Sequence, residues 1–319
     1  MYCLDKKQYH SMNTYRIFSR IAGGIVAALL IATMAGCDKE PTSNPNKGDI
    51  MFSSEHHTFG VVDSEEWFEI PVTATHATEQ SRTLGIEVIA AKSSAMEGHD
   101  FELASHTLTI KGGSKSGAIR LKGIAENFDH NTSKSITLRL VLNPENIANE
   151  ESIETTVVLQ HCCPFDINDF EGYAVLTSTW CMQYMNSDSR LVRTHVEAGD
   201  GIIVVEDMLY DGYDIRVKLN TEDILNPTAL LCDTQVLGST GDAFGTIYGD
   251  GKILIAEAST YNSTTADLSS YISFYSTCEK FMMLYTVMYV EGVGEIGMFG
   301  NILEWVSDNE AERIMREGL

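Results

Sequence analysis

Short runs of alternating apolar and polar residues recur along the first half of the chain, and they constrain the fold more than any other feature. Alternation with period two places apolar side chains on one face of a β-strand and polar side chains on the other. Polar loops separate the runs at regular intervals, which is typical of an antiparallel sandwich. The predicted strands are 67–73, 84–89, 107–110, 118–121, 135–140 and 154–159. The sequence therefore predicts an all-β fold that begins with an antiparallel β-sandwich.

The composition changes at the Cys162-Cys163-Pro164 segment, so we place a domain boundary at residues 160–165. The part that follows is richer in Tyr, Met and Gly, and we expect a second β-sandwich or a barrel-like domain. Its predicted strands are 202–205, 213–219, 252–256 and 281–290. Asp-Gly pairs, which suit type I′ hairpin turns, stand at 200–201, 211–212 and 250–251. The run 281–290 is apolar throughout, which predicts a strand buried on both faces.

The N-terminus has the features of a bacterial lipoprotein signal peptide. Arg16 and Arg20 precede an uncharged apolar run at 21–35, and Gly36-Cys37 follows it. The run is shorter than the roughly 20 residues of a transmembrane helix, and it ends in the small residues of a cleavage site. We expect cleavage before Cys37, attachment of lipid to Cys37, and a lipid-anchored protein of the outer membrane that is exposed at the cell surface.

Five segments follow from these features. Ser307 and Glu310 fit a capping box, which predicts a short helix at the end of the chain. The predicted organisation is a signal peptide at 1–36, a polar tether at 37–48, a β-sandwich at 49–161, a C-terminal β domain at 162–306 and a helical tail at 307–319.

The formal net charge of -23 limits the partners of the protein. Nucleic-acid binding rests on Lys and Arg that neutralise phosphates, so nucleic acid is not expected as a partner. The same acidity opposes adsorption to anionic lipid, so the lipid on Cys37 is the expected membrane attachment. Soluble cations and neutral sugars remain compatible with such a surface.

Besides Cys37, which is expected to carry lipid, the expected mature chain contains five cysteines, an odd number, so at least one thiol is unpaired within the chain. They are Cys162, Cys163, Cys181, Cys232 and Cys278. An exported chain can form disulfides, and a bridge from Cys162 or Cys163 to Cys181 is one expectation. Buried free thiols are the alternative. The spacing does not match a zinc site.

Residues 52–142 resemble the Calx-beta sandwich, an immunoglobulin-like fold, in a divergent form common in lipoproteins of Bacteroidetes. The resemblance is carried by Gly98-His99-Asp100-Phe101, then by 108–110, Gly113, 119–121 and 136–138. Members of that family bind calcium through acidic side chains at one end of the sandwich, which implies calcium as a candidate cofactor. The candidate ligands here are Asp63, Asp100 and Asp129. Calcium takes six to eight oxygens, and Lys134 stands where the family usually has a glutamate, so this set of ligands is incomplete.

The second half is similar to a C-terminal β domain, without a defined activity, that follows such sandwiches in surface lipoproteins of gut Bacteroidetes. Residues 163–172 and 271–275, together with Phe299-Gly300, carry this resemblance. The resemblance implies a β architecture and a location at the cell surface. It also implies a layout similar to that of accessory proteins of starch-utilisation-type glycan uptake systems. The partners it implies are polysaccharide or envelope proteins of such a system.

Sugar binding needs exposed aromatic rings with carboxylates or amides nearby, because the apolar face of a pyranose stacks on such rings. The candidate binding residues are Trp180, Tyr184, Tyr210, Tyr213 and Asp214. The alternative is that these rings pack inside the β domain.

Catalytic patterns are absent from the sequence. Acidic pairs arise freely in so acidic a chain, and there is no Gly-x-Ser-x-Gly elbow, phosphate loop or dinucleotide fingerprint. We therefore expect no enzyme and no catalytic residues. The predicted function is non-catalytic binding of an extracellular carbohydrate as an accessory to glycan uptake. The alternative is an adhesin-like or structural envelope protein that binds another protein.

Overall fold

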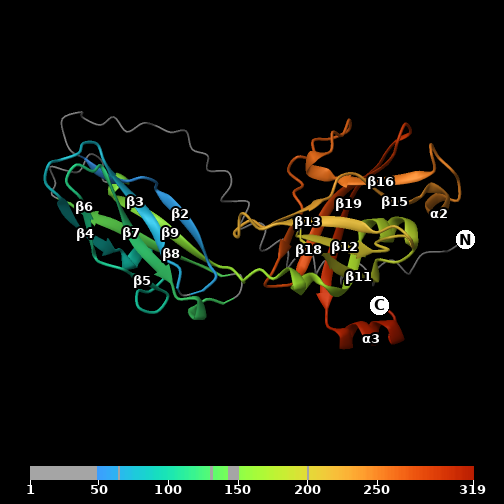
Figure 1. The fold of residues 1–319 in the computed structure, drawn as a ribbon, viewed down its shortest axis with the longest axis horizontal. Coiled ribbons are helices and arrows are strands. Elements are labelled where there is room, and N and C mark those ends of the chain that lie inside the picture. The colour runs from blue at the N-terminus through green and yellow to red at the C-terminus, as the bar shows by residue number, and fades with distance from the viewer. Residues whose placement is uncertain (1–48, 64, 130–131, 143–150, 200) are drawn as a thin grey trace, which may run out of the picture. The chain divides into compact units, whose positions relative to one another are not determined.

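The computed structural model describes residues 49–63, 65–129, 132–142, 151–199 and 201–319 (Figure 1). Two compact units divide the chain: Met1–Thr58 with Asp63–Leu159, and Phe59–Val62 with Gln160–Leu319. The predicted signal peptide and the whole of the predicted tether, Cys37 included, lie outside the described residues. Within the described residues, no helix is both long enough and apolar enough to cross a membrane.

The first unit is a β-sandwich of two sheets, as the sequence predicts. One sheet has the order β1-β3-β7-β5 and the other β2-β9-β8-β4-β6. The strands are β1 (Ile50–Phe52), β2 (His56–Val61), β3 (Phe68–Ala74), β4 (Arg82–Val88), β5 (Phe101–Leu103), β6 (Thr107–Ile110), β7 (Ser116–Gly123), β8 (Ser133–Val141) and β9 (Glu154–His161). Alternate residues of β3 and β9 are buried, so the apolar half of each pattern forms the core between the sheets.

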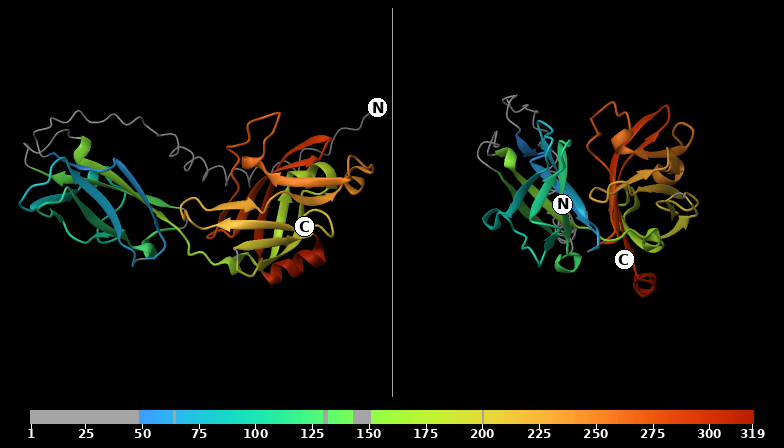
Figure 2. Two further views of the ribbon diagram at one scale, coloured as in Figure 1. Left: turned by 45° about the horizontal axis from the view of Figure 1, so that its top comes forward. Right: turned by 60° about the vertical axis from the view of Figure 1, so that its left-hand side comes forward.

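The second unit is built on a closed antiparallel barrel, which decides between the two architectures that the sequence left open. The barrel strands pair in the order β18-β17-β14-β13-β12-β11-β10-β19, and β19 pairs again with β18. They are β10 (Gly172–Ser178), β11 (Ser189–Glu197), β12 (Ile202–Glu206), β13 (Ile215–Asn220), β14 (Thr228–Leu231), β17 (Phe274–Ser276), β18 (Phe281–Val290) and β19 (Gly294–Val306). β15 (Gln235–Ser239) and β16 (Lys252–Glu257) form a hairpin, and β16 pairs with the C-terminal half of β18 (Figure 2).

Strand β18 explains how the barrel closes. It pairs with β19 along its whole length, while its other edge pairs with β17 over Phe281–Met283 and with β16 over Thr286–Tyr289. Its inner face adds Met282, Leu284 and Met288 to the barrel core. On its outer face Val287 packs with Ala258 and Leu268 of the β16–β17 loop. The predicted burial of both faces of 281–290 is thereby confirmed.

Side chains fill the interior of the barrel, which is consistent with the small size of an eight-stranded barrel. A polar network interrupts the apolar core, and in it Ser178 Oγ donates to Asn301 Oδ1 at 2.7 Å. Asn301 Nδ2 in turn donates to Thr286 Oγ1 at 3.0 Å. All three side chains are completely buried, and these hydrogen bonds connect β10, β19 and β18 where the barrel closes.

Several local expectations are wrong. Gly212 and Gly251 have positive φ, but Asp211 and Asp250 do not, so neither pair forms the predicted type I′ turn. The chain is also helical before its tail: β10 runs into a π-helix at Cys181–Met185, and α2 occupies Thr240–Phe244. The tail itself forms α3 (Asp308–Glu317), where Ser307 Oγ accepts from Glu310 N as the capping pattern predicts.

The disulfide expected at Cys181 is also wrong. Cys163 pairs with Cys278 in the turn between β17 and β18, and the bond closes a loop of 115 residues. Cys181 and Cys162 are buried free thiols, and Cys232 is partly exposed and free. Burial raises the pKa of the Cys181 thiol, which keeps it in its neutral form.

Candidate functional site

Trp180 is completely buried at one end of the barrel, so it does not form the predicted sugar-stacking surface. The chain turns inward after β10, and Trp180 becomes the centre of an aromatic cluster. Its indole Nε1 donates to the Tyr210 hydroxyl at 3.1 Å. The ring centroids of Tyr184, Phe299 and Phe244 lie 4.4, 5.0 and 6.2 Å from its own. The indole therefore seals the barrel core, and contact with a sugar would require displacing its neighbours.

Two other predicted binding residues, Tyr184 and Tyr210, join this cluster as partly buried side chains packed against the core. Burial raises the pKa of the Tyr210 hydroxyl, since the charged form would lose its hydration. The Tyr184 hydroxyl accepts from Gln183 Nε2 at 3.1 Å. The structure thus brings Trp180, Tyr184 and Tyr210 together, but as packing around the barrel end rather than as an open aromatic face.

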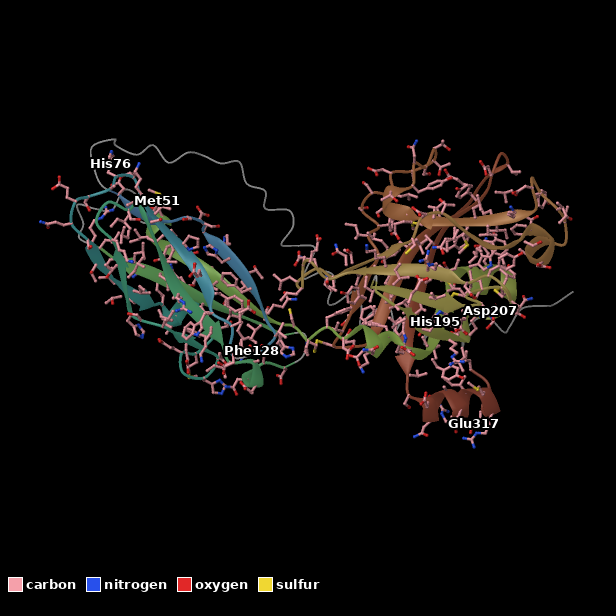
Figure 3. All side chains as sticks on the ribbon, in the orientation of Figure 1. Met51, His76, Phe128, His195, Asp207 and Glu317 are labelled. Atoms are coloured by element: carbon pink, nitrogen blue, oxygen red, sulfur yellow. A yellow bond between two sulfur atoms is a disulfide. The ribbon has the colours of Figure 1, made fainter. Side chains whose placement is uncertain are left out.

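The remaining two candidates, Tyr213 and Asp214, belong to the loop between β12 and β13. Asp214 Oδ1 accepts from the backbone N–H of Asp207 at 2.9 Å, and Asp207 accepts from Gly212 N in turn. Asp207, labelled in Figure 3, has a positive φ of 47°, a conformation that these side-chain hydrogen bonds support. The Asp214 carboxylate therefore has a role in shaping this loop.

The predicted calcium ligands do not converge. Among the described residues, the carboxylate oxygens of Asp63, Asp100 and Asp129 do not come within 4.8 Å of one another. Asp63 is exposed and caps its own turn by accepting from Glu65 N at 2.8 Å. Asp129 is exposed as well. The prediction of a shared metal site from these three side chains is wrong.

Lys134 provides the positive charge beside Asp100. Its Nζ lies 2.6 Å from Asp100 Oδ1 and 3.1 Å from the carbonyl oxygen of Asn127, and it stands 5.2 Å from the ring centroid of Phe128 (labelled in Figure 3). Burial acts to raise the pKa of Asp100. The hydrogen bonds from Lys134, Met96 N and His99 outweigh it and lower the pKa to about 2. An ammonium group therefore neutralises the buried carboxylate that the resemblance assigned to calcium.

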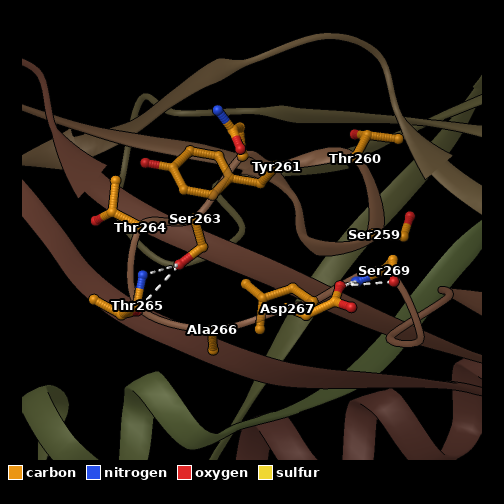
Figure 4. Close-up of a pocket in the computed structure, with 11 residues that line it drawn as sticks. Ser259, Thr260, Tyr261, Ser263, Thr264, Thr265, Ala266, Asp267 and Ser269 are labelled. Carbon is orange, nitrogen blue, oxygen red and sulfur yellow. Dashed lines mark hydrogen bonds between the residues drawn. The ribbon is translucent and has the colours of Figure 1, made fainter.

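A different site lies on the outside of the barrel, in the loop between β16 and β17. Residues 259–269 of this loop line a hollow of about 540 Å³ (Figure 4). Leu268 anchors the loop by packing with Ala258 and Val287 over the outer face of β18. The ring of Tyr261, which lies along one side of the hollow in Figure 4, packs 5.2 Å from the ring of Tyr289.

Two carboxylates hold the shape of this loop. Glu295 of β19 accepts from Ser263 Oγ at 2.9 Å, from Thr264 N at 3.1 Å and from Thr265 Oγ at 3.2 Å. Hydrogen bonds from the Ser263 side chain and the Thr264 backbone lower the pKa of Glu295. Asp267 Oδ1 accepts from the backbone and the hydroxyl of Ser269, and these hydrogen bonds lower its pKa. Both carboxylates therefore stay ionised.

The lining offers many hydrogen-bonding groups and one aromatic ring. It contains seven residues that bear hydroxyl groups, namely Ser259, Thr260, Tyr261, Ser263, Thr264, Thr265 and Ser269. Asn262 adds an amide, and Asp267 is the one carboxylate among the eleven lining residues. Glycoside hydrolysis by a protein acid and base uses two carboxyl groups, and this lining lacks the second. The density of Ser and Thr between residues 259 and 270 marks this site in the sequence, and the prediction of a sugar site from aromatic residues did not include it.

The fold and the site define a two-unit all-β protein in which a sandwich precedes a closed barrel and a hydroxyl-rich loop covers the outside of that barrel. The family model described as "domain of unknown function (DUF4984)" matches residues 151–317, which is more than half of the chain. The chain belongs to this family, and the matched residues cover the barrel and α3. No curated protein matches the chain.

Three solved structures show how the chain compares with known folds. The apo-form Calx CBD1 domain is 19% identical, with coverage of 35% of this chain and 96% of that chain and a TM-score of 0.29. A protein of unknown function from Bacteroides ovatus is 10% identical, covers 80% of this chain and 89% of its own, and has a TM-score of 0.33. A putative carbohydrate binding protein from Bacteroides ovatus ATCC 8483 is 12% identical, with coverage of 79% and 74% and a TM-score of 0.30.

Proposed function

We infer that this protein binds an extracellular carbohydrate without transforming it, and that the hollow formed by residues 259–269 is the binding site. The observation that carries the proposal is the chemistry of this lining, in which hydroxyl, amide and carboxylate groups line the hollow together with the Tyr261 ring. The predicted lipoprotein signal peptide at 1–36, with Cys37 directly after it, supports a role at the outer membrane, as an accessory to glycan uptake.

The physical properties of the hollow favour a neutral polyhydroxyl ligand. Its volume of about 540 Å³ lies within the range of small-molecule sites. A pyranose offers apolar C–H groups to an aromatic face and hydroxyls to polar side chains. Tyr261 supplies the first kind of contact, while Asn262 and Asp267 can hydrogen-bond to the hydroxyls. The lining has no Lys, Arg or His, so it offers no counter-charge to a phosphate or a carboxylate ligand.

Binding of the purified protein to a panel of plant and host polysaccharides tests this proposal, with Tyr261→Ala as the diagnostic variant. We expect saturable binding to one class of glycan and at least a tenfold loss of affinity in Tyr261→Ala. Tyr271→Ala is the matched control, because Tyr271 is an exposed tyrosine of the same loop that does not line the hollow. An equal loss in both variants, or no binding to any glycan, would contradict the proposal.

One observation favours a protein partner as the second candidate function. Ile247, Tyr248 and Val293 are exposed by 65%, 47% and 58%. They belong to two adjoining loops, since a Cβ at Gly249 would lie 3.1 Å from Val293 Cγ2. Exposed apolar side chains gathered in one place are typical of protein interaction sites. Ile247→Asp would weaken recruitment of an envelope protein, but would leave carbohydrate binding unchanged.

A further inference from the structure

Three metal-ligating side chains meet where the end of β9 and the segment after it lie against the turn between β17 and β18. Within the described residues, His161, Cys163 and Cys278 form the one such group, and their ligand atoms all lie within 4.8 Å of one another. Each of the three residues is partly exposed. The two sulfurs are joined in the disulfide of the barrel unit. The group therefore contains two potential thiolate ligands and an imidazole, and its chemistry depends on the redox state of the bond.

We propose that this disulfide is a redox-controlled metal site, which takes up one zinc-like divalent cation when the bond is reduced. A small dithiol reduces Cys163–Cys278 by two electrons and is itself oxidised to a cyclic disulfide. The S–S bond breaks, and each cysteine sulfur gains a proton. The cation then binds both sulfurs as thiolates and releases these two protons to solvent. A nitrogen of His161 is the third ligand, and water is the fourth.

The geometry suits a tetrahedral cation. Zinc binds sulfur at about 2.3 Å and imidazole nitrogen at about 2.0 Å, so ligand atoms in a tetrahedral site stand roughly 3.5 to 3.8 Å apart. The ligand atoms of the three side chains all lie within 4.8 Å of one another, and both cysteines are in connecting segments rather than inside strands, so the two sulfurs can move apart once the bond is broken. Rotation of the side chains can therefore provide most of the adjustment. Imidazole has two nitrogens, so His161 can ligate through one and keep a contact through the other.

A second contact holds the two segments together independently of the disulfide. Thr277 Oγ1 donates to the carbonyl oxygen of Cys163 at 3.2 Å. The ladder between β17 and β18 also fixes both ends of the turn that carries Cys278. The sulfurs therefore remain neighbours after reduction. The adjacent Cys162 is directed elsewhere, because its buried Sγ donates to the carbonyl oxygen of Ile224 at 3.7 Å.

Cobalt(II) titration of the full chain in detergent tests this proposal, with a phosphine as the reductant because it does not compete as a thiol ligand. We expect no binding to the oxidised protein. After reduction we expect one Co²⁺ per chain, with thiolate-to-cobalt charge-transfer absorption that added Zn²⁺ abolishes. His161→Gln keeps the disulfide, and it should weaken the metal affinity of the reduced protein by about 10- to 100-fold.

Matched cysteine variants separate this site from adventitious thiol binding. Cys278→Ser should abolish the charge-transfer band, whereas Cys232→Ser, which removes a partly exposed free thiol elsewhere in the barrel unit, should leave it unchanged. Tryptophan fluorescence reports whether the reduced chain is folded. The proposal is overturned by a reduced chain that unfolds, by the absence of the band, or by a band that persists in Cys278→Ser. Equal affinities for His161→Gln and the parent protein would overturn it as well.

Discussion

At the scale of single residues, the Lys134–Asp100 pair makes the clearest prediction. Lys134→Met leaves a buried carboxylate without its ammonium partner, so we expect a loss of about 2 to 4 kcal/mol in the stability of the sandwich near pH 7. Hydrogen exchange in β5 and β7, followed as a function of urea, measures the loss within this unit. Lys111→Met is the matched control, because Lys111 is exposed in the same unit. Equal stabilities of the two variants would contradict the prediction.

The pH dependence of this pair has a definite sign. The folded-state pKa of Asp100 is about 2, below its value in an unfolded chain, so the pair stabilises the fold above about pH 4. That stabilisation falls away as the pH drops from about 4 towards 2, because the protonated carboxyl no longer needs the ammonium group. The stability difference between Lys134→Met and the parent protein should shrink over the same interval.

The contribution of Glu257 to stability has the opposite pH dependence. Burial raises its pKa, although it accepts from Ser273 Oγ at 2.7 Å and from Leu231 N at 3.3 Å. A raised folded pKa favours folding while the carboxyl is protonated, and that stability is lost as the pH rises above its unfolded value of about 4.3. Glu257→Gln cannot ionise, so we expect it to gain stability relative to the parent protein between pH 4.5 and 7.5. Urea unfolding at the two pH values checks this, and an unchanged difference would refute it.

At the scale of elements, Glu257 and Gly238 show how the β15–β16 hairpin fits the barrel. Leu231 N of β14 donates to the Glu257 carboxylate of β16. This contact lies near the point along β18 where its pairing partner changes from β17 to β16. The Glu257 side chain thus connects β14 to β16 at the level where these strands diverge. Gly238, at the bulge of β15, lies under Tyr210, and a Cβ there would stand 2.5 Å from Tyr210 Cδ2. The hairpin can therefore pack against Tyr210 at the barrel end because residue 238 has no side chain.

Gly238→Ala should therefore destabilise the barrel. The added methyl group must displace the Tyr210 ring, which cannot move freely because it packs against the core. Overpacking of this kind lowers stability by about 1 to 3 kcal/mol. Gly300→Ala is the matched control, since Gly300 also lies in a strand but nothing stands within 4 Å of its Cβ position. Urea midpoints followed by tryptophan fluorescence compare the two. A Gly238→Ala midpoint no lower than that of Gly300→Ala would contradict this account.

The elements also show what the sequence could predict. Period-two alternation and the apolar run 281–290 identified about half of the strands in the described residues, because both are local consequences of burial. Closure of the barrel was not predictable, since the pairing of β10 with β19 joins residues more than 100 positions apart, and neither strand carries a local mark of its partner. Trp180 was misassigned for a related reason: a polar loop follows it in sequence, yet the π-helix turns its ring into the core.

At the scale of the whole molecule, the disulfide makes the largest single contribution to stability that we predict. A cross-link across 115 residues restricts the unfolded chain, and loops of this length correspond to about 4 to 5 kcal/mol. The double variant Cys163→Ser/Cys278→Ser should therefore lower the stability of the barrel unit by this amount. The sandwich unit, which contains neither cysteine, should keep its stability.

The tryptophans allow this prediction to be measured in one unit at a time. Trp180 and Trp305 belong to the barrel core, whereas Trp67 belongs to the first unit, so fluorescence in a Trp67→Phe background reports on the barrel. The urea midpoint of that signal should fall in the double serine variant, while hydrogen exchange in β3 and β7 should not change. Cys232→Ser controls for loss of a thiol. A barrel midpoint that is unchanged in the double variant would mean that the bond adds no net stability, and that the strand ladders and the buried Ser178–Asn301–Thr286 network are sufficient to keep the barrel closed.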